Sequence, residues 1–339
     1  MINFRFHLVS LVAVFLAMGL GILVGSTVID QKIVNRLDTE IRRVSKDNDA
    51  RKAESKKLAN ENADQQDFIA RAAPYVVDGR LDGQSIAIIA ERGVDAGVVK
   101  KTEALLRSAG ADVPGVLWLD DSWLLDTDQR KADLESAVAV HGDQSVIRAR
   151  ALDLLANRLA TAPTTATTTT TSKRGGSSTA TSTTRRSTTT TISPAKVDVL
   201  GELDAAGFLS VTDGNASDFS NFPAHTGHVL VITGDNSHFL GAGMTSALAH
   251  ALVRAEVPAV VAAIYDAGSN TDNPPERGAS LSSVLDDRVL SRAVSTLDDL
   301  DLEQGQIGAA LTLEVVANGA IGHYGYGPDA SAPLPPHPS

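Results

Sequence analysis

The sequence contains no cysteine in its 339 residues, and this absence removes several kinds of chemistry. Disulfide bonds, thiolate metal sites and cysteine nucleophiles are excluded, and the absence fits either side of a cell membrane. Aromatic residues make up only 4% of the chain, so nothing indicates a surface that stacks on nucleotide bases or sugars. The net charge of -11 argues against nucleic-acid binding, because proteins of that class normally present a basic face.

The common catalytic motifs are also missing. There is no G-x-S-x-G, P-loop, H-E-x-x-H or C-x-x-C pattern. Gly241-Ala242-Gly243 opens a predicted helix, where amide groups can hold an anion, but the rest of the dinucleotide fingerprint is lacking. The acidic residues of the C-terminal third include two short groups, Asp286-Asp287 and Asp298-Asp299 with Asp301. Such groups are more often solvated turns than acid–base pairs, so we expect no enzyme activity.

What the sequence does have is one long apolar run. Residues 8–29 read LVSLVAVFLAMGLGILVGSTVI, which is 22 residues without an ionisable side chain. At about 1.5 Å per residue, a helix of this length spans a hydrocarbon core of about 30 Å. A cleaved signal has a shorter apolar core, and Val24-Gly25-Ser26 matches its small-residue cleavage site poorly. We therefore predict a single-pass membrane anchor within residues 1–29.

One face of this anchor carries small residues, and the charges around it bear on its orientation. Ala17, Gly21 and Gly25 recur at i, i+4 spacing, which lets two membrane helices approach closely but is a weak indication of a dimer by itself. The basic residues that follow the run are Lys32, Arg36, Arg42, Arg43 and Lys46, against Arg5 before it. This bias favours a cytoplasmic C-terminal side, although large domains are exported regardless of it.

A long polar helix with a heptad repeat is predicted for residues 30–73. The repeat positions are Val34, Leu37, Ile41, Val44, Asn48, Arg51, Ser55, Leu58, Asn62, Gln65, Ile69 and Ala72. Seven of these twelve are apolar, and a buried asparagine at an a position, as for Asn48 and Asn62, tends to select two strands. We predict a parallel homodimer through the anchor and this coiled coil, with a single solvated stalk as the alternative. Pro74 is expected to end the helix.

The remaining chain predicts a parallel-sheet α/β head built from two similar strand-helix-strand units. The predicted elements are strands at 85–90, 116–119, 228–233 and 259–265, and helices at 95–108, 130–140, 145–159 and 241–256. Alternation of strand and helix is typical of parallel α/β folds, and the segments at 105–121 and 252–266 resemble each other. We assign the two halves of the head to residues 83–160 and 194–330.

Two segments of biased composition flank these halves. Residues 161–193 are mostly threonine and serine without an acidic residue, and such a segment cannot bury a core. We predict a disordered insert, which either carries O-glycans in an exported protein or is a tolerated loop. The Pro-rich tail, residues 331–339, is also predicted to be disordered.

Histidines offer the only metal ligands of note outside the membrane. His225 and His228 form an H-x-x-H pattern, and His238 follows ten positions later. Neutral imidazole suits Cu(II) and Zn(II), so these three residues are the candidate metal ligands. The alternative is that they are ordinary surface histidines of a loop. No other cofactor is indicated by the residues.

Three stretches of the sequence resemble a known family. The start MINFRFHLVSLVAVFLAMGLGILVGSTVID, the stretch STLDDLDLEQGQIGAALTLE and the ending GHYGYGPDA resemble the actinobacterial copper transporter MctB-like proteins. The resemblance covers the whole chain except the Thr-rich insert. It implies a cell-envelope protein linked to copper homeostasis, labelled in one member as an outer-membrane copper transport protein, with the head outside the cytoplasm. No catalytic or ligand residues come with the resemblance.

Two hypotheses for function follow. The first is an envelope protein of copper homeostasis, acting in copper transport or efflux, with copper ion as its ligand. The second is a non-enzymatic coiled-coil scaffold that acts in cell separation or cell-wall remodelling with a membrane-protein partner, because relatives in the family are linked to that process. A single span makes a tether more readily than a channel.

Overall fold

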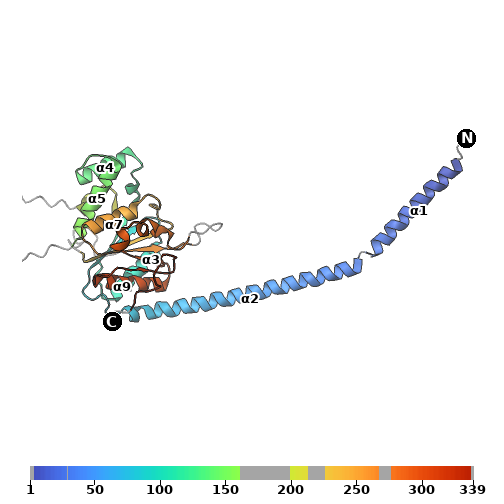
Figure 1. The fold of residues 1–339 in the computed structure, drawn as a ribbon, viewed down its shortest axis with the longest axis horizontal. Helices are drawn as coiled ribbons and strands as arrows, with labels where there is room; N and C mark the ends of the chain where they lie inside the picture. Colours follow the sequence, from blue (N-terminus) through green and yellow to red (C-terminus); the bar gives the residue numbers. More distant parts are fainter. Residues whose placement is uncertain (1–3, 29, 161–198, 213–225, 267–275, 337–339) are drawn as a thin grey trace, which may run out of the picture. The chain divides into compact units, whose positions relative to one another are not determined.

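The computed structural model describes residues 4–28, 30–160, 199–212, 226–266 and 276–336, and the side chains of residues 26–34 lie outside this description. The chain divides into two units, residues 1–68 and residues 69–339. Figure 1 follows both along the sequence. The Thr-rich insert and His225 lie outside the described residues. Each unit is treated by itself below.

The first unit consists of helix α1 (Phe4–Val28) and most of helix α2 (Asp30–Val77). Residues 4–25 of α1 have a mean hydropathy of 2.6 and none of this window is buried, and among the described helices only α1 is long and apolar enough to cross a membrane. Nothing lies within 4 Å of a side-chain position at Gly21 or Gly25. These features fit the predicted membrane anchor.

Helix α2 is continuous over 48 residues, as the heptad pattern requires. Its heptad positions Leu37, Ile41, Val44 and Leu58 are 57–61% exposed, so no described part of the chain covers these apolar side chains. The prediction that Pro74 ends the helix is wrong, because α2 runs on to Val77. Proline removes one backbone hydrogen bond there, but burial of Ala73 and Val77 in the head offsets that loss.

The head contains a seven-stranded sheet in the order β3-β2-β1-β4-β5-β6-β7. Its strands are β1 (Ile86–Glu91), β2 (Val116–Leu119), β3 (Leu209–Thr212), β4 (His228–Gly234), β5 (Ala259–Ile264), β6 (Ser295–Leu297) and β7 (His323–Tyr324). All neighbours are parallel except β2 and β3. The predicted parallel-sheet α/β head is confirmed, with β1 and β4 side by side at its centre.

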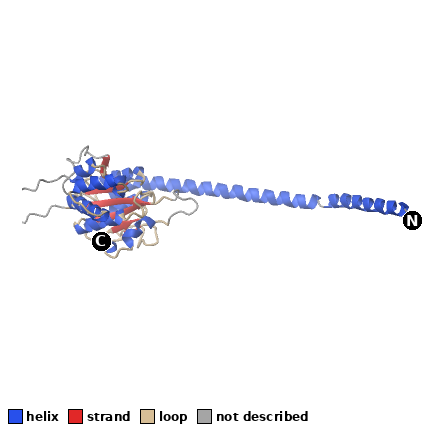
Figure 2. Cartoon of the chain, turned by 90° about the horizontal axis from the view of Figure 1, so that it is seen from above, coloured by secondary structure: helices blue, strands red, loops and turns tan. Residues whose placement is uncertain are grey.

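Helices cover both faces of the sheet (Figures 1 and 2). One face carries α3 (Ala96–Ser108), α9 (Glu303–Ala317) and the last turns of α2. The other carries α4 (Asp128–Val138), α5 (Gln144–Leu159), α6 (Val199–Ala205), α7 (Met244–Arg254) and α8 (Ser282–Leu285). Each face has its own apolar core, because alternate residues of each strand point to opposite sides.

Several elements escaped the sequence analysis for physical reasons. Helix α9 buries nine of its 15 residues and so lacks a clear apolar stripe, while β6 and β7 are only three and two residues long. The predicted disorder of the tail is wrong for Ser331 and Ala332. The Ser331 amide donates to the His323 carbonyl at 2.8 Å, and Ala332 pairs with Tyr324.

Candidate functional site

The topology of the head points to one edge of the sheet. The crossover from β1 to β2 runs through α3, and the crossover from β4 to β5 runs through α7 on the opposite face. The connection after β1 leads to β2 on one side of the central pair, and the connection after β4 leads to β5 on the other side. Open parallel sheets commonly bind ligands at such a switch point, beyond the carboxyl ends of the strands.

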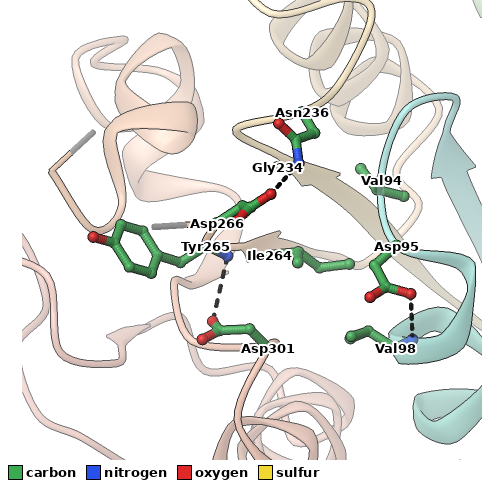
Figure 3. Close-up of a pocket in the computed structure, with 9 residues that line it drawn as sticks. All are labelled: Val94, Asp95, Val98, Gly234, Asn236, Ile264, Tyr265, Asp266 and Asp301. Carbon is green, nitrogen blue, oxygen red and sulfur yellow. Dashed lines mark hydrogen bonds between the residues drawn. The ribbon is translucent and has the colours of Figure 1, made fainter. Parts of the chain in front are cut away.

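A cavity of about 240 Å³ opens at this carboxyl edge (Figure 3). Its lining residues are Val94, Asp95, Val98, Gly234, Asn236, Ile264, Tyr265, Asp266 and Asp301. Aliphatic side chains form part of the wall, and three carboxylates and an amide supply its polar groups. The cavity is smaller than most sites for drug-sized ligands.

Local hydrogen bonds fix the polar groups of the cavity (Figure 3). Asp95 caps α3 and accepts hydrogen bonds from the amides of Gly97 at 2.7 Å and Val98 at 3.4 Å. The Asn236 side chain donates to the carboxylate of Asp266, which joins the ends of β4 and β5. The amide of Tyr265 donates to Asp301. These side chains thus serve the fold as well as the cavity.

Arg277 supplies positive charge beside the cavity. Its guanidinium donates to both oxygens of Asp301, at 2.7 and 3.0 Å, and lies 4.2 Å from the ring centroid of Tyr265. Burial alone would lower the pKa of Arg277, but the hydrogen bonds and charge of Asp301, with the neighbouring aspartates, raise it. The arginine therefore stays charged and holds Asp301 in place.

The acidic group that contains Asp301 is not a solvated turn, and that prediction is wrong for its first two members. Asp298 is 4% exposed and accepts amide hydrogen bonds from Tyr326 at 2.8 Å and Gly327 at 2.9 Å. Asp299 is fully buried, and among the described residues neither carboxylate oxygen has a hydrogen-bond partner. Burial, with the charges of Asp298 and Asp301, raises the pKa of Asp299 to about 7.

Glu91 is a further buried carboxylate, and the sequence analysis missed it. It ends β1 and accepts hydrogen bonds from the hydroxyls of Thr233, Ser237 and Thr245. Burial raises its pKa, and the three hydrogen bonds oppose that effect. The signal was available, since a glutamate closes the apolar run IAIIAE. Its partners lie 142–154 residues away in the chain, so no local pattern could reveal them.

The structure does not bring the predicted histidine ligands together. His228 begins β4, and His238 lies beyond the other end of this strand, where its Nδ1 is 2.7 Å from Asp121. Seven strand residues span about 20 Å, which is too far for both to bind one ion. Burial lowers the pKa of His228, and no residue in the described ranges is a hydrogen-bond partner of its Nδ1. Within the described ranges, no group of three or more His, Asp or Glu residues is placed to hold a metal ion.

His323, in the motif at the end of the chain, has a structural role. One ring nitrogen lies 2.9 Å from the Thr296 hydroxyl, and the other lies 2.9 Å from the Ser291 carbonyl. Because a carbonyl only accepts, Nε2 carries the proton and Nδ1 accepts from the hydroxyl. Both nitrogens are therefore occupied.

Comparison with known proteins decides the family. A family model described as "Copper transport outer membrane protein, MctB" matches residues 1–335. The chain belongs to the MctB family. The proteins named copper transporter MctB of Mycobacterium tuberculosis and Mycobacterium bovis are each 24% identical over 345 residues, covering 96% of this chain and 97% of the relative. The resemblance drawn from the three sequence stretches is thereby confirmed.

Membership in the MctB family extends over α1, α2 and the head alike. On α2, Asn48 and Asn62 are exposed together with the apolar heptad positions, whereas the side chain of Val34 lies outside the description. Ile69 packs against the core of the head. The exposed part of the predicted helix–helix interface on α2 therefore stops before Ile69.

Proposed function

We propose that this chain is a membrane-tethered cell-envelope protein of copper homeostasis, acting in copper transport or efflux. The single observation that carries the proposal is the family match over residues 1–335. The apolar helix α1 supports the tether, because 22 residues at its start suffice for one membrane span. The soluble head then acts outside the cytoplasm, as a binding module without enzyme activity.

The physiological test is deletion of the gene from the parent bacterium. We expect the deletion strain to lose copper tolerance, and we expect the full chain to restore it. A variant that lacks residues 4–28 should fail to restore it, because the head is no longer held at the membrane. A deletion strain with unchanged growth across a copper series would overturn the proposal.

Direct binding of copper by the chain needs a test of its own. This test replaces the two histidines of the H-x-x-H pattern. The detergent-solubilised full chain is titrated with Cu(II) by calorimetry, beside a variant with His225→Ala and His228→Ala. His141→Ala is the matched control, because this side chain is 86% exposed. Stoichiometric binding that only the double variant loses supports ligation by this pattern. Background heat for the unmodified chain rules out direct ligation.

A second function is a scaffold for cell separation or wall remodelling. The apolar side chains on α2 favour it, because a solvated stalk has no need of exposed leucine, isoleucine and valine. A variant that lacks residues 30–65, which keeps the buried end of α2, is compared with the full chain in native membranes. Loss of a co-purifying membrane protein, together with cell chaining, supports the scaffold. Unchanged recovery and normal separation contradict it.

A further inference from the structure

An apolar face runs along α2, and the described residues of the chain leave it uncovered. Leu37, Ile41, Val44 and Leu58 follow each other at heptad spacing and are 57–61% exposed. We call these four residues, with the polar heptad positions between Leu37 and Gln65, the seam face. The last apolar heptad position, Ile69, packs against the head and leaves this face. The seam face is thus about 40 Å long at about 1.5 Å per residue.

The rows that flank the seam face differ in charge. The g positions are Glu40, Asp47, Glu54 and Glu61, and all four are exposed. The corresponding e positions are Ser45, Lys52, Ala59 and Gln66. The e row begins one heptad earlier, at Asp38. The g row is therefore uniformly acidic, while the e row carries one aspartate and one lysine and is neutral overall.

This difference selects the orientation of a second helix on the seam face. In an antiparallel pair the g rows face each other, so four carboxylates of one chain would oppose four of the other. In a parallel pair each g position faces the e position five residues later on the other chain. Asp47 then meets Lys52 of the second copy, and the other three carboxylates meet serine, alanine and glutamine.

The apolar positions select the same orientation. A parallel, in-register pair stacks Leu37, Ile41, Val44 and Leu58 each on itself. It also places Asn48 opposite Asn48 and Arg51 opposite Arg51, and the long arginine side chains can direct their charged ends to solvent. A fully overlapped antiparallel pair would keep Ile41 against Leu58 but would set Leu37 against Asn62 and Val44 against Ser55. Such pairing would bury amide and hydroxyl groups against apolar side chains, which costs free energy.

We propose that two copies of this chain pair in parallel and in register through the seam face, and that the acidic g row fixes the orientation. The pairing goes beyond the proposed function and does not depend on it. An anchor at the same end of each chain fits this arrangement, because both chains enter one membrane from the same side.

The absence of native cysteine makes the test clean, because each introduced thiol is unique. Val44→Cys and Ser55→Cys are prepared separately in the full chain, and each is oxidised mildly in membranes. In a parallel pair each thiol faces its own copy, so each variant alone gives a covalent dimer. In an antiparallel pair only a mixture of the two variants does so. Ala53→Cys, on the outer face of α2, is the control.

We expect each single variant to give at least about five times as much covalent dimer as the control. Only thiols in the seam face come close enough to their counterparts to form a disulfide bond. Covalent dimer that forms only in the mixture overturns the orientation. Covalent dimer at or below the level of the Ala53→Cys control in every sample overturns the pairing itself. Exposed helix positions tolerate these substitutions, and circular dichroism of each variant verifies the helix.

Discussion

At the scale of single residues, two of the buried carboxylates in the head, Glu91 and Asp299, lie in opposite circumstances. Glu91 accepts hydrogen bonds from three hydroxyls, whereas the carboxylate of Asp299 has no hydrogen-bond partner among the described residues and lies near Asp298 and Asp301. A hydrogen-bonded carboxylate can stiffen a fold, but an unpaired buried charge opposes folding. The two residues should therefore respond differently to substitution.

Asp299 makes the stability of the head depend on pH. Its pKa of about 7 in the folded chain lies above the value of about 3.9 expected when unfolded. Below pH 4 the Asp299 carboxyl is protonated in both the folded and the unfolded chain. Between pH 4 and 7 it ionises only in the unfolded chain, so the free energy of unfolding falls as the pH rises through 7. In urea titrations of the full chain we expect a fall of at most about 4 kcal/mol over that range, at about 1.4 kcal/mol per pH unit.

Asp299→Asn should remove most of this pH dependence, because the amide stays neutral throughout. The exposed Asp329→Asn is the control and should follow the unmodified chain. If Asp299→Asn keeps the full dependence between pH 4 and 7, the titrating group lies elsewhere.

Glu91→Ala should lower the free energy of unfolding by about 2–5 kcal/mol, because it leaves a cavity and three hydroxyls without their acceptor. Chemical denaturation at pH 7 measures the change. Glu54→Ala removes an exposed carboxylate from α2 and should change stability by less than about 0.5 kcal/mol. Equal effects for the two variants would show that the hydroxyl network adds little.

At the scale of elements, α2 has two different parts. Over residues 30–65 it is a polar helix with an exposed apolar face, while its last turns belong to the core of the head. Pro74 lies in that second part, inside a helix that continues for three more residues. The local preference for a helix end is thus overridden by packing of Ala73 and Val77.

Pro74→Ala should raise the stability of the head by about 1–3 kcal/mol, because it restores a helical hydrogen bond and removes a ring that clashes with the preceding turn. The thermal midpoint of the full chain, followed by circular dichroism, measures the effect. A lower midpoint would mean that the proline bend is needed to seat Val77 in the core.

At the scale of the whole molecule, family membership and site geometry answer different questions. The family match spans anchor, stalk and head, and it supports a role in copper transport. The described part of the head offers a small acidic cavity at the switch point and two histidines at opposite ends of β4. The geometry therefore separates His238 from any site that the H-x-x-H pattern forms.

His238→Ala should leave unchanged any Cu(II) affinity that His225→Ala with His228→Ala abolishes, because about 20 Å of strand lies between the two ends. Calorimetry of the full chain compares the variants. A loss of affinity in His238→Ala equal to that of the double variant would contradict this separation.

The sequence by itself determined the elements that local pattern controls. An uninterrupted apolar run predicted α1, heptad spacing predicted a continuous α2, and apolar runs separated by helical stretches predicted β1, β2, β4 and β5. The prediction succeeded there because hydrophobic periodicity is a local property. The coiled-coil pairing and the disordered insert stay predictions.

Only the tertiary structure decided what depends on distant contacts. It buried Asp298 and Asp299, gave Glu91 its hydroxyl partners, carried α2 past Pro74 and separated His228 from His238. The hydroxyl partners of Glu91 lie 142–154 residues away in the chain and are brought to it when β1 and β4 pair at the centre of the sheet, whereas the two histidines are separated by the length of β4 itself. Local sequence does not encode such neighbours, because the free energy that fixes them comes from packing the two cores.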